Sequence, residues 1–460
     1  MNNCAFSALP LPESLLHSLQ ILGYTQMTAI QARSLPPMLN GQDIIAQGQT
    51  GSGKTVAFSL NVLHKLNVKY FRVQALVLCP TRELADQVAA EIRKLARSIH
   101  NIKVLTLCGG SPVGPQIGSL EHGAHIIVGT PGRIVDHLEK GRLSLQDLTT
   151  LVLDEADRML EMGFQDALET IIQHAPKQRQ TLLFSATYPP KIQDIAASIL
   201  HNPVSIQVEA DQQTNNITQR FFQVADNHQR LDALHKLLLQ QQPQSSIVFC
   251  NTKRDTQDIA TALADYGFSV LALHGDLEQK DRDQTLVRFA NRSACILVAT
   301  DVAARGLDID AVDAVFNYQL AHDAETHIHR IGRTGRAGNS GIAFSLFTAS
   351  DAGKLLQLED LTGTAINSEA LPDDKVLQQQ PLQPEMATIQ LDGGKKQKLR
   401  PGDIVGALTN SKQLTGDDIG RIQVYDIWSY IAVKRNQLKL ALQILQQGKI
   451  KGKSVRVRTL

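Results

Sequence analysis

The chain has 460 residues, of which 43% are hydrophobic and 20% charged, so it is too long for one ordinary core and has the composition of a folded globular protein. No apolar run approaches the ~20 residues that span a bilayer, and the first residues lack the basic start and apolar stretch of a secretory signal. Five scattered cysteines without CxxC spacing fit a reducing compartment better than disulfides or zinc. We therefore expect a cytoplasmic protein of about three domains, with no membrane contact.

The net charge of +1 hides an uneven distribution. Residues 385–460 contain nine Lys and five Arg against six acids, a balance of +8, which leaves −7 for residues 1–384. A basic module attached to an acidic body favours a polyanionic partner for that module. The alternative is a basic tail that serves only solubility.

From about residue 44 to residue 346, short apolar runs alternate with longer amphipathic stretches, which is typical of repeated βαβ units. The strands predicted for a first parallel sheet lie at 42–45, 75–79, 104–107, 125–128, 151–153 and 181–184. Those predicted for a second sheet lie at 246–249, 269–273, 294–299, 314–317 and 341–346. Polar residues 209–216 and the Pro- and Gln-containing residues 371–384 are predicted linkers. The expected domains are therefore 1–208, 217–368 and 385–460.

A glycine-rich segment follows the first predicted strand and precedes an apolar helix. Its sequence, Gly-Gln-Thr-Gly-Ser-Gly-Lys-Thr, is that of a phosphate-binding loop, in which glycines let backbone N–H groups turn toward phosphate oxygens. Lys54 would reach the β- and γ-phosphates of ATP, and Thr55 would place its hydroxyl on Mg2+. The alternative is a glycine-rich turn without function. The nucleotide-binding residues expected here are Gly48, Gln49, Thr50, Gly51, Ser52, Gly53, Lys54 and Thr55.

An acidic sequence, Asp-Glu-Ala-Asp at 154–157, follows the predicted strand at 151–153. Open α/β sheets bind ligands at the carboxyl ends of their strands, so these acids are candidates for a site. Asp154 would hold Mg2+, and Glu155 would orient or deprotonate a water. The alternative is a solvated helix start, which is the commoner use of an acidic cluster. The acids and the phosphate-binding loop form one site if both lie on the same sheet edge.

Arginines separated by glycines occur at 329–336, in the sequence His-Arg-Ile-Gly-Arg-Thr-Gly-Arg. They suit a loop that lies close to an anion, because guanidinium groups match phosphate geometry. A basic surface loop and a structural salt-bridge cluster are the alternatives. His327 and His329 could also be a metal pair, but no Cys or third His stands at ligand spacing, and zinc sites usually need three or four protein ligands.

The basic module predicts the element order β-α-β-β-α-β. Its strands are expected at 387–391, 422–425, 430–433 and 454–457, and its helices at 403–409 and 436–447. Lys449, Lys451 and Lys453 alternate with other residues, which on an extended chain gives one charged face. Such a face suits a phosphate backbone.

Further short sequences resemble the motifs of DEAD-box ATP-dependent RNA helicases, from Phe6 to about Leu346. They occur in the family's order at 23–31, 48–55, 80–85, 109–110, 130–133, 154–157, 185–187, 249–252, 279–282, 300–308 and 329–336. The resemblance implies an α/β fold with two RecA-like parallel-sheet lobes, which bind RNA and hydrolyse ATP with Mg2+. The catalytic residues that it implies are Lys54, Asp154, Glu155, Arg333 and Arg336.

The resemblance also implies how the nucleotide is read. Gln31 would hydrogen-bond the adenine edge and Tyr24 would stack near it, with Phe6 at the family's upstream aromatic position. Taken alone, Tyr24 and Gln31 could simply pack at a helix start. Asp308 would meet the ribose, and Arg333 and Arg336 would reach the γ-phosphate.

On the RNA side, the resemblance implies backbone contacts from both lobes. They are expected at Thr81, Arg82, Gly110, Thr130, Arg133, Arg282 and Thr300. Ser185, Thr187 and His329 would link hydrolysis to strand separation. One departure from the family pattern is His327, where relatives commonly carry Tyr.

Residues 428–433 resemble the core of an RNA-recognition motif, in which two strand aromatics, here Trp428 and Tyr430, stack on bases. The motif is degenerate, because Asp426 and Ile427 replace its opening Lys/Arg-Gly and Val433 takes an aromatic position. The alternative is that both aromatics are packing residues. Residues 386–404 resemble bacterial family members whose small α+β C-terminal domain binds a hairpin of large-subunit (23S) ribosomal RNA, so the resemblance implies a role in ribosome assembly.

Because Lys54 and Asp154 belong to one predicted lobe and Arg333 to the other, we expect closure of the lobes on ATP to couple ATP binding to RNA binding. The expected function is an RNA-stimulated ATPase that separates short RNA duplexes and acts as a monomer. A processive DNA helicase and a nucleotide-controlled, non-catalytic RNA clamp or scaffold are the alternatives.

Overall fold

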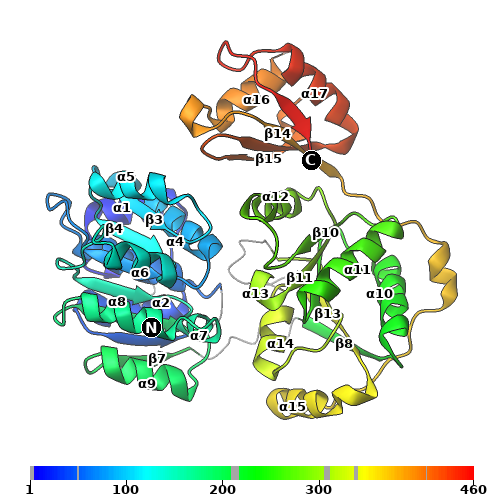
Figure 1. Ribbon diagram of the computed structural model, residues 1–460, viewed down its shortest axis with the longest axis horizontal. Coiled ribbons are helices and arrows are strands. Elements are labelled where there is room, and N and C mark those ends of the chain that lie inside the picture. The colour runs from blue at the N-terminus through cyan, green and yellow to red at the C-terminus, as the bar shows by residue number, and fades with distance from the viewer. Residues whose placement is uncertain (1–4, 49–50, 209–216, 305–310, 336–339, 411) are drawn as a thin grey trace. The chain divides into compact units, whose positions relative to one another are not determined.

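The computed structural model of the chain describes residues 5–48, 51–208, 217–304, 311–335, 340–410 and 412–460 (Figure 1). These residues form two compact units, and the division between them falls within residues 209–216. The first unit holds the first predicted lobe, and the second holds both the second lobe and the C-terminal domain. Within the described part of the chain, no helix has both the length and the apolar character to cross a bilayer.

The first unit is built on a parallel sheet with the strand order β3-β4-β2-β5-β6-β1-β7. Its strands are β1 Ile44–Gln47, β2 Ala75–Leu78, β3 Val104–Leu107, β4 Ile126–Gly129, β5 Thr150–Leu153, β6 Gln180–Ser185 and β7 Val204–Gln207. Its helices are α1 Glu13–Ile21, α2 Ala29–Leu39, α3 Lys54–Lys65, α4 Arg82–Leu95, α5 Val113–Glu121, α6 Pro131–Glu139, α7 Ala156–Glu161, α8 Gln165–His174 and α9 Pro190–Ile199.

Both faces of this sheet are buried. Val77 and Val152 contribute to one apolar cluster, whereas Leu76 and Leu151, their neighbours along the strands, contribute to another. This arrangement explains why the central strands are continuous apolar runs instead of alternating patterns. It also leaves the carboxyl ends of the strands as the edge where polar motifs can gather.

The second lobe has the strand order β10-β11-β9-β12-β13-β8, again with all neighbours parallel. Its strands are β8 Ile217–Gln223, β9 Ser246–Cys250, β10 Val270–Leu273, β11 Ile296–Thr300, β12 Ala314–Asn317 and β13 Gly341–Phe347. Its helices are α10 Asn227–Gln241, α11 Lys253–Asp265, α12 Gln279–Ala290, α13 Asp301–Ala304, α14 Ala324–Ile331 and α15 Ala352–Thr362.

The C-terminal domain has the predicted order β-α-β-β-α-β and an antiparallel sheet ordered β15-β16-β14-β17. Its elements are β14 Met386–Leu391, α16 Pro401–Thr409, β15 Ile419–Val424, β16 Ser429–Lys434, α17 Leu438–Gln447 and β17 Val457–Thr459. Two parallel-sheet lobes followed by a small α+β domain confirm the expected fold class.

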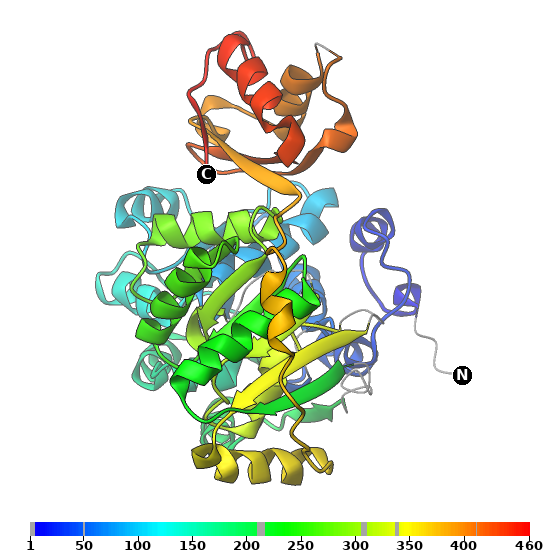
Figure 2. The same ribbon diagram turned by 90° about the vertical axis from the view of Figure 1, so that its right-hand side faces the viewer.

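The predicted linker at 371–384 is not a free connector. Val376 is buried in the apolar cluster of the second lobe, and the short 3-10 segment Asp374–Gln378 runs along α10 (Figure 2). Lys236 on α10 forms an ion pair with Asp374. The segment connects the second lobe to the C-terminal domain, as expected, and its one apolar anchor, Val376, holds it against the lobe.

Most predicted strands agree with the structure to within two residues, and three deviations have clear causes. The strands β7 and β8 were not predicted, because they lie at sheet edges and carry mixed polar and apolar residues. The last strand begins at Val457 and not at residue 454, since residues 450–453 form a tight turn closed by hydrogen bonds between Ile450 and Lys453. The expected extended, charged face at 448–453 is therefore absent there.

Candidate active site and nucleic-acid interface

The phosphate-binding loop leads from β1 into α3, as predicted. Gly51 and Gly53 have φ values of 87° and 96°, a region that L residues with side chains rarely adopt. A Cβ on Gly53 would lie 2.5 Å from Gln31 Nε2, so the close approach also requires glycine. Lys54 starts α3, is 7% exposed, and its Nζ donates to Gly48 O at 2.6 Å. Gln49 and Thr50 lie outside the described residues.

The start of α2 is tied to this loop. Gln31 Oε1 accepts from Thr28 N (2.9 Å) and Gln31 Nε2 donates to Gly53 O (3.0 Å), while Thr28 Oγ1 donates to Ser52 O (2.7 Å). Both ends of the buried Gln31 amide are thus engaged, so this residue fixes the loop relative to α2. Its expected adenine contact stays a prediction.

The two aromatic residues expected near adenine are placed differently. Phe6 is 3% exposed and packs in the apolar core of the first lobe. Tyr24 is half-buried, and its hydroxyl donates to Glu91 Oε1 at 3.1 Å. Burial and the neighbouring Glu91 carboxylate raise the pKa of Tyr24 to about 12. Packing therefore accounts for both positions, and their nucleotide roles stay predictions.

The acids at the carboxyl end of β5 occupy the expected sheet edge. Asp154 N donates to Leu78 O (3.0 Å), which continues the pairing of β5 with β2, and its side chain is 3% exposed. Burial raises the pKa of Asp154 to about 7, although the positive charge of Lys54 and a hydrogen bond from Glu155 N–H oppose this shift. Lys54 and Asp154 therefore belong to one site, as the motifs predicted.

Glu155 has a φ of 51°, which is strained for a residue with a side chain. It caps α7 at the point where the strand turns into the helix. Strain at such a turn is typical of functional sites, because the surrounding structure must hold the residue in place.

The residues present fit a divalent cation. Burial makes a carboxyl group difficult to ionise, and a bound cation compensates for this by stabilising the carboxylate. A carboxylate together with a hydroxyl also provides the hard oxygen donors that Mg2+ prefers. Asp154 supplies the carboxylate, and Thr55, one residue beyond Lys54, supplies the hydroxyl. Among the described residues, no group of three His, Cys, Asp or Glu could hold a metal by itself.

Asp157 connects α7 to the segment after β6. Its Oδ2 accepts hydrogen bonds from both Thr187 N and Thr187 Oγ1 at 3.0 Å, and its N–H donates to Ser185 Oγ at 3.3 Å. The segment predicted to link hydrolysis to strand separation is therefore bonded to the acidic motif. Sequence reasoning gave Asp157 no role, although its place in the acidic motif was a signal.

The RNA residues predicted in the first lobe gather at neighbouring strand ends. Thr81 follows β2 and caps α4, and Thr130 follows β4 and accepts from Gly109 N (3.2 Å). Arg133 Nη1 and Nη2 donate to Ser111 O at 3.2 and 3.3 Å. Arg82 pairs with Asp86 at 3.6 Å, and Gly110 has a φ of 72°. The structure brings these residues to one edge, but their RNA contacts stay predictions.

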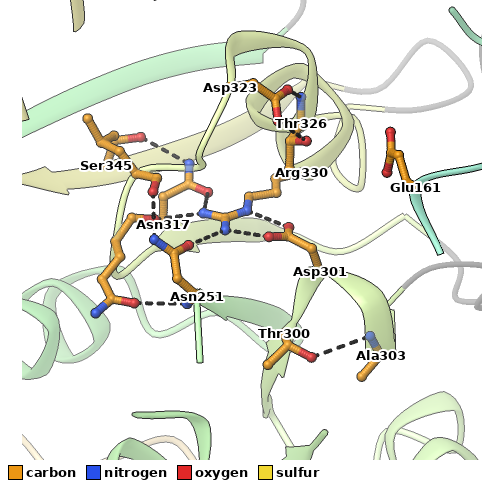
Figure 3. A network of polar contacts seen from close by, with 12 residues as sticks. Glu161, Asn251, Thr300, Asp301, Ala303, Asn317, Asp323, Thr326, Arg330 and Ser345 are labelled. Carbon is orange, nitrogen blue, oxygen red and sulfur yellow. Dashed lines mark hydrogen bonds and ion pairs between the residues drawn. The ribbon is translucent and has the colours of Figure 1, made fainter. Parts of the chain in front are cut away.

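The second lobe has a buried arginine at the centre of a polar network (Figure 3). Arg330 on α14 makes five hydrogen bonds: two to the Asp301 carboxylate (2.6 and 2.7 Å), and one each to Asn251 Oδ1 (2.7 Å), Gln319 O (2.6 Å) and Asn317 Oδ1 (3.4 Å). An arginine has five N–H donors, so all of them are used. The side chain is 1% exposed. It joins α14 to segments that follow β9, β11 and β12. For Arg330 the network fits the alternative of a structural salt-bridge cluster, although the sequence did not predict its partners.

Residues expected to act in the second lobe surround this network. Thr300 ends β11 next to Asp301, and its Oγ1 accepts from Ala303 N at 3.4 Å. Arg282 Nη2 donates to Ala303 O at 2.9 Å. Arg333 follows α14, and its O accepts from Val312 N (3.0 Å). Asp308 and Arg336 lie outside the described residues.

The two histidines of this segment differ. His327 is 1% exposed, and its Nε2 lies 3.0 Å from Gln219 Oε1. Burial and nearby Arg330 lower the pKa of His327 to about 4. His329 is half-buried, and its Nδ1 has no hydrogen-bond partner within the described chain. The His327 departure from the family pattern is thus accommodated as a neutral packing residue.

The C-terminal domain places its two aromatic candidates differently. Tyr430 on β16 is 0% exposed, which fits the alternative of a packing residue, and its RNA contact stays a prediction. Trp428 is half-buried in the turn before β16. Lys449 and Lys453 are exposed, whereas Lys451 pairs with Asp403 (2.8 Å) and donates to Lys398 O (2.8 Å).

A phosphate-binding loop next to a buried acid at the edge of a parallel sheet, with a second parallel-sheet lobe and a basic α+β domain, defines a phosphate-loop nucleotide hydrolase with a nucleic-acid-binding attachment. Family models agree. The DEAD/DEAH box helicase model matches residues 28–195, the helicase conserved C-terminal domain model matches 229–338, and the DbpA RNA binding domain model matches 388–459.

Whole-chain comparisons give the same result. The ATP-dependent RNA helicase DbpA of Escherichia coli (strain K12) is 52% identical over 99% of both chains, and that of Bacillus subtilis (strain 168) is 37% identical over 98% of both. The solved structure of S. cerevisiae Dbp5 bound to RNA and ADP BeF3 matches with a TM-score of 0.71 and 32% identity, over 82% of this chain and 100% of its own. Mss116p bound to ssRNA and AMP-PNP matches with a TM-score of 0.71 and 28% identity, over 80% and 78%.

The chain therefore belongs to the DEAD-box family of ATP-dependent RNA helicases, and its C-terminal part is an RNA-binding domain like that of DbpA. These findings confirm the expected family, the expected enzyme class and the use of ATP and RNA.

Proposed function

We propose that this RNA helicase separates short RNA duplexes locally, acts on large-subunit (23S) ribosomal RNA during ribosome assembly, and works in the cytoplasm as a monomer. The basic C-terminal domain and its match to the DbpA RNA binding domain support a dedicated RNA target. The resemblance to family members that bind ribosomal RNA supports the choice of that target.

For the nucleotide, we propose that Lys54 binds the β- and γ-phosphates and that Glu155 orients or deprotonates the attacking water. Asp154 and Thr55 would hold Mg2+, which when bound neutralises charge on the phosphates. The γ-phosphate would also meet Arg333 and Arg336, the ribose Asp308, and the adenine Gln31, Tyr24 and Phe6. The observation that carries this assignment is the buried Asp154 carboxyl beside Lys54 at the end of β5.

For RNA, we propose that the strand-end residues of the first lobe and Arg282 and Thr300 of the second contact the backbone. In the C-terminal domain, exposed Lys449 and Lys453 and half-buried Trp428 are the candidate contacts. Ser185, Thr187 and His329 would transmit the state of the nucleotide. Because the phosphate-binding loop and Arg333 belong to different units, closure on ATP would assemble the site and couple ATP to RNA.

The RNA target is tested by deleting residues 385–460. Phosphate release is measured for the full and shortened chains with a 23S hairpin fragment and with a generic RNA duplex. We expect the full chain to prefer the hairpin fragment by at least about tenfold in half-maximal RNA concentration, and the shortened chain to keep basal ATPase without that preference. A shortened chain that still discriminates the two RNAs would show that the specificity lies elsewhere.

A further inference from the structure

The loop after β3 carries Gly110, one of the residues proposed to contact RNA. Gly109 and Gly110 are both exposed, and Gly110 has a φ of 72°, which glycine adopts without strain. Two adjacent glycines leave a backbone free to take many conformations unless other groups fix it. The position of this loop therefore depends on hydrogen bonds from neighbouring elements.

Two other proposed RNA residues hold the outer part of this loop, which we define as residues 108–111. Thr130 Oγ1 accepts from Gly109 N (3.2 Å), and Arg133 Nη1 and Nη2 donate to Ser111 O (3.2 and 3.3 Å). A guanidinium binds phosphate through the same N–H donors. If RNA takes these donors, as proposed, Arg133 no longer holds the loop, and another anchor is needed.

The inner end of the loop has an anchor that RNA does not reach. Gln116 on α5 is 8% exposed, and its Nε2 donates to Cys108 O (3.1 Å). Cys108 directly follows β3 and is itself buried. This hydrogen bond therefore fixes the point at which the backbone leaves the sheet and enters the loop, and RNA does not compete for it.

His137 on α6 completes this arrangement. It is 0% exposed, and its Nε2 lies 3.2 Å from Gln116 Oε1. Because the Gln116 amide nitrogen donates to Cys108, its oxygen faces the imidazole, so His137 donates through Nε2–H. A neutral imidazole has one N–H, which leaves Nδ1 as an acceptor, and this atom has no partner within the described chain. Burial lowers the pKa of His137, which favours this neutral form.

The buried anchor, which we define as Gln116 and His137, has a fixed geometry. An amide that is bonded at both its nitrogen and its oxygen cannot rotate without losing a hydrogen bond. Arg133 and His137 are four residues apart on α6, so they lie on the same face of this helix. One reaches Ser111 and the other reaches Gln116. A single helix face therefore holds the loop from both sides.

We propose that Gln116 and His137 are positioning residues for RNA binding, which set the place of Gly110 from the buried side of the loop and do not touch RNA. This inference rests on the proposed function, in which Gly110 and Arg133 contact RNA. A loop that is already in place binds RNA without first losing the conformational entropy of its glycines. Loss of the buried anchor should therefore weaken RNA binding and spare the ATP site, which lies at β1 and β5.

Gln116→Leu tests the proposal, because leucine has a similar volume and makes neither hydrogen bond. RNA-stimulated phosphate release by the full chain is measured against the concentration of a generic RNA duplex, together with the unfolding midpoint in urea. We expect the half-maximal RNA concentration to rise about tenfold, since a buried hydrogen bond is lost. Phosphate release at saturating RNA and the KM for ATP should stay within about twofold of the parent.

Asn61→Leu is the matched control for a loss of stability alone. Asn61 on α3 is buried, and its Nδ2 donates to Gln180 Oε1 (2.8 Å) at the start of β6, the opposite edge of the sheet from the loop. This variant should also lower the unfolding midpoint but leave the half-maximal RNA concentration unchanged. If Asn61→Leu and Gln116→Leu raise that concentration equally, Gln116 has only a structural role and the proposal is wrong.

His137 provides an independent check. His137→Phe keeps a ring but removes the donor, and we expect the half-maximal RNA concentration to rise by about three- to fivefold. His137→Gln returns an amide N–H to the same side and should restore the parent value. Because both residues act through one amide, His137→Phe should add less than about twofold to the effect of Gln116→Leu. Effects that multiply in the double variant would contradict the proposal.

Arg133→Ala distinguishes a failure of this inference from a failure of the proposed function. If Arg133→Ala raises the half-maximal RNA concentration and Gln116→Leu does not, RNA contacts the loop but Gln116 does not position it, and only the inference is wrong. If neither variant changes it, the loop does not contact RNA, and both are wrong. If Gln116→Leu alone raises it, the inference holds and the assignment of Arg133 is wrong.

Discussion

The two parallel-sheet lobes bury charge in opposite ways. In the first lobe, the Asp154 carboxyl is buried and its pKa is raised to about 7, so the charge of Lys54 and one backbone N–H do not compensate for burial. In the second lobe, the Arg330 guanidinium is buried more completely, yet five hydrogen bonds satisfy it. In two lobes of the same architecture, the protein's own groups therefore stabilise the charge of Arg330 but do not fully stabilise the charge of Asp154.

The difference shows which buried charge serves a ligand. An internally satisfied charge positions the segments around it, here the ends of β9, β11 and β12 with α14. A carboxyl group that the protein leaves costly to ionise, such as Asp154, is stabilised in its charged form when a cation arrives. Mutation of Arg330 should therefore change mainly folding, whereas mutation of Lys54 or Glu155 should change mainly activity.

The largest effect is expected for Arg330→Met. Removing one partner of a buried ion pair leaves Asp301 without compensation, so we expect a loss of ~3–5 kcal/mol in the free energy of unfolding of the second lobe. Urea unfolding of the full chain measures it. Arg254→Met is the matched control, because this arginine is 90% exposed and should have no measurable effect. If the two variants unfold at the same urea concentration, the network has no stabilising role.

The opposite pattern is expected for Lys54→Ala and Glu155→Gln. RNA-stimulated phosphate release should fall by ~100-fold or more, since each removes a group that acts on the transferring phosphoryl or its attacking water. The unfolding midpoint should stay close to that of the parent. Lys69→Ala, at an exposed position of the same lobe, should leave both unchanged. If either variant lost activity because it unfolds, the proposed difference between the two lobes would be wrong.

A smaller effect of unusual sign is expected for Asp154→Asn. Because burial raises the pKa of Asp154 to about 7, the folded state binds a proton that the unfolded state releases between about pH 4 and 7. The wild-type chain therefore loses stability as the pH rises through this range, and the amide does not. At pH 8 without nucleotide, we expect the variant to be more stable by roughly 1–3 kcal/mol while it loses ATPase activity. An equal or lower stability would contradict the burial of an uncompensated acid.

The smallest effect concerns His327. Its pKa is lowered to about 4, so the folded state binds fewer protons than the unfolded state below about pH 6.5, and stability falls as the pH drops from there toward 4. We expect His327→Phe to remove roughly 1–2 kcal/mol of that loss in an acid unfolding series. Replacement of exposed His322 by Phe is the control and should leave the slope unchanged. If stability falls equally steeply with falling pH in the wild-type chain and both variants, the burial of His327 does not cause the loss.

Local sequence patterns predicted the first lobe's site well, because its parts are contiguous motifs at strand ends. The phosphate-binding loop and the acids of 154–157 each carry their own chemistry within a few residues, and the βαβ alternation places both at one sheet edge. Edge strands such as β7 were missed, since Ile206 is its one buried residue and no apolar run marks it.

Long-range networks and domain contacts were not predictable in the same way. The partners of Arg330 come from residues 251, 301, 317 and 319, and nothing local to each of them shows that they converge. Tyr430 was assigned to RNA because an aromatic on a sheet face has the same pattern whether it stacks on a base or packs on another domain. Only its burial separates the two uses.

Amide hydrogen exchange tests the contrast between the lobes most directly. The full chain is compared with and without Mg2+ and ADP, and protection is followed at residues 51–58, at 154–161 and along α14. We predict that nucleotide raises protection at the first two segments by at least about tenfold, while α14 around Arg330 is already protected and changes little. The account would be contradicted if nucleotide left the protection of residues 154–161 unchanged. It would also be contradicted if α14 were unprotected without nucleotide and became protected with it.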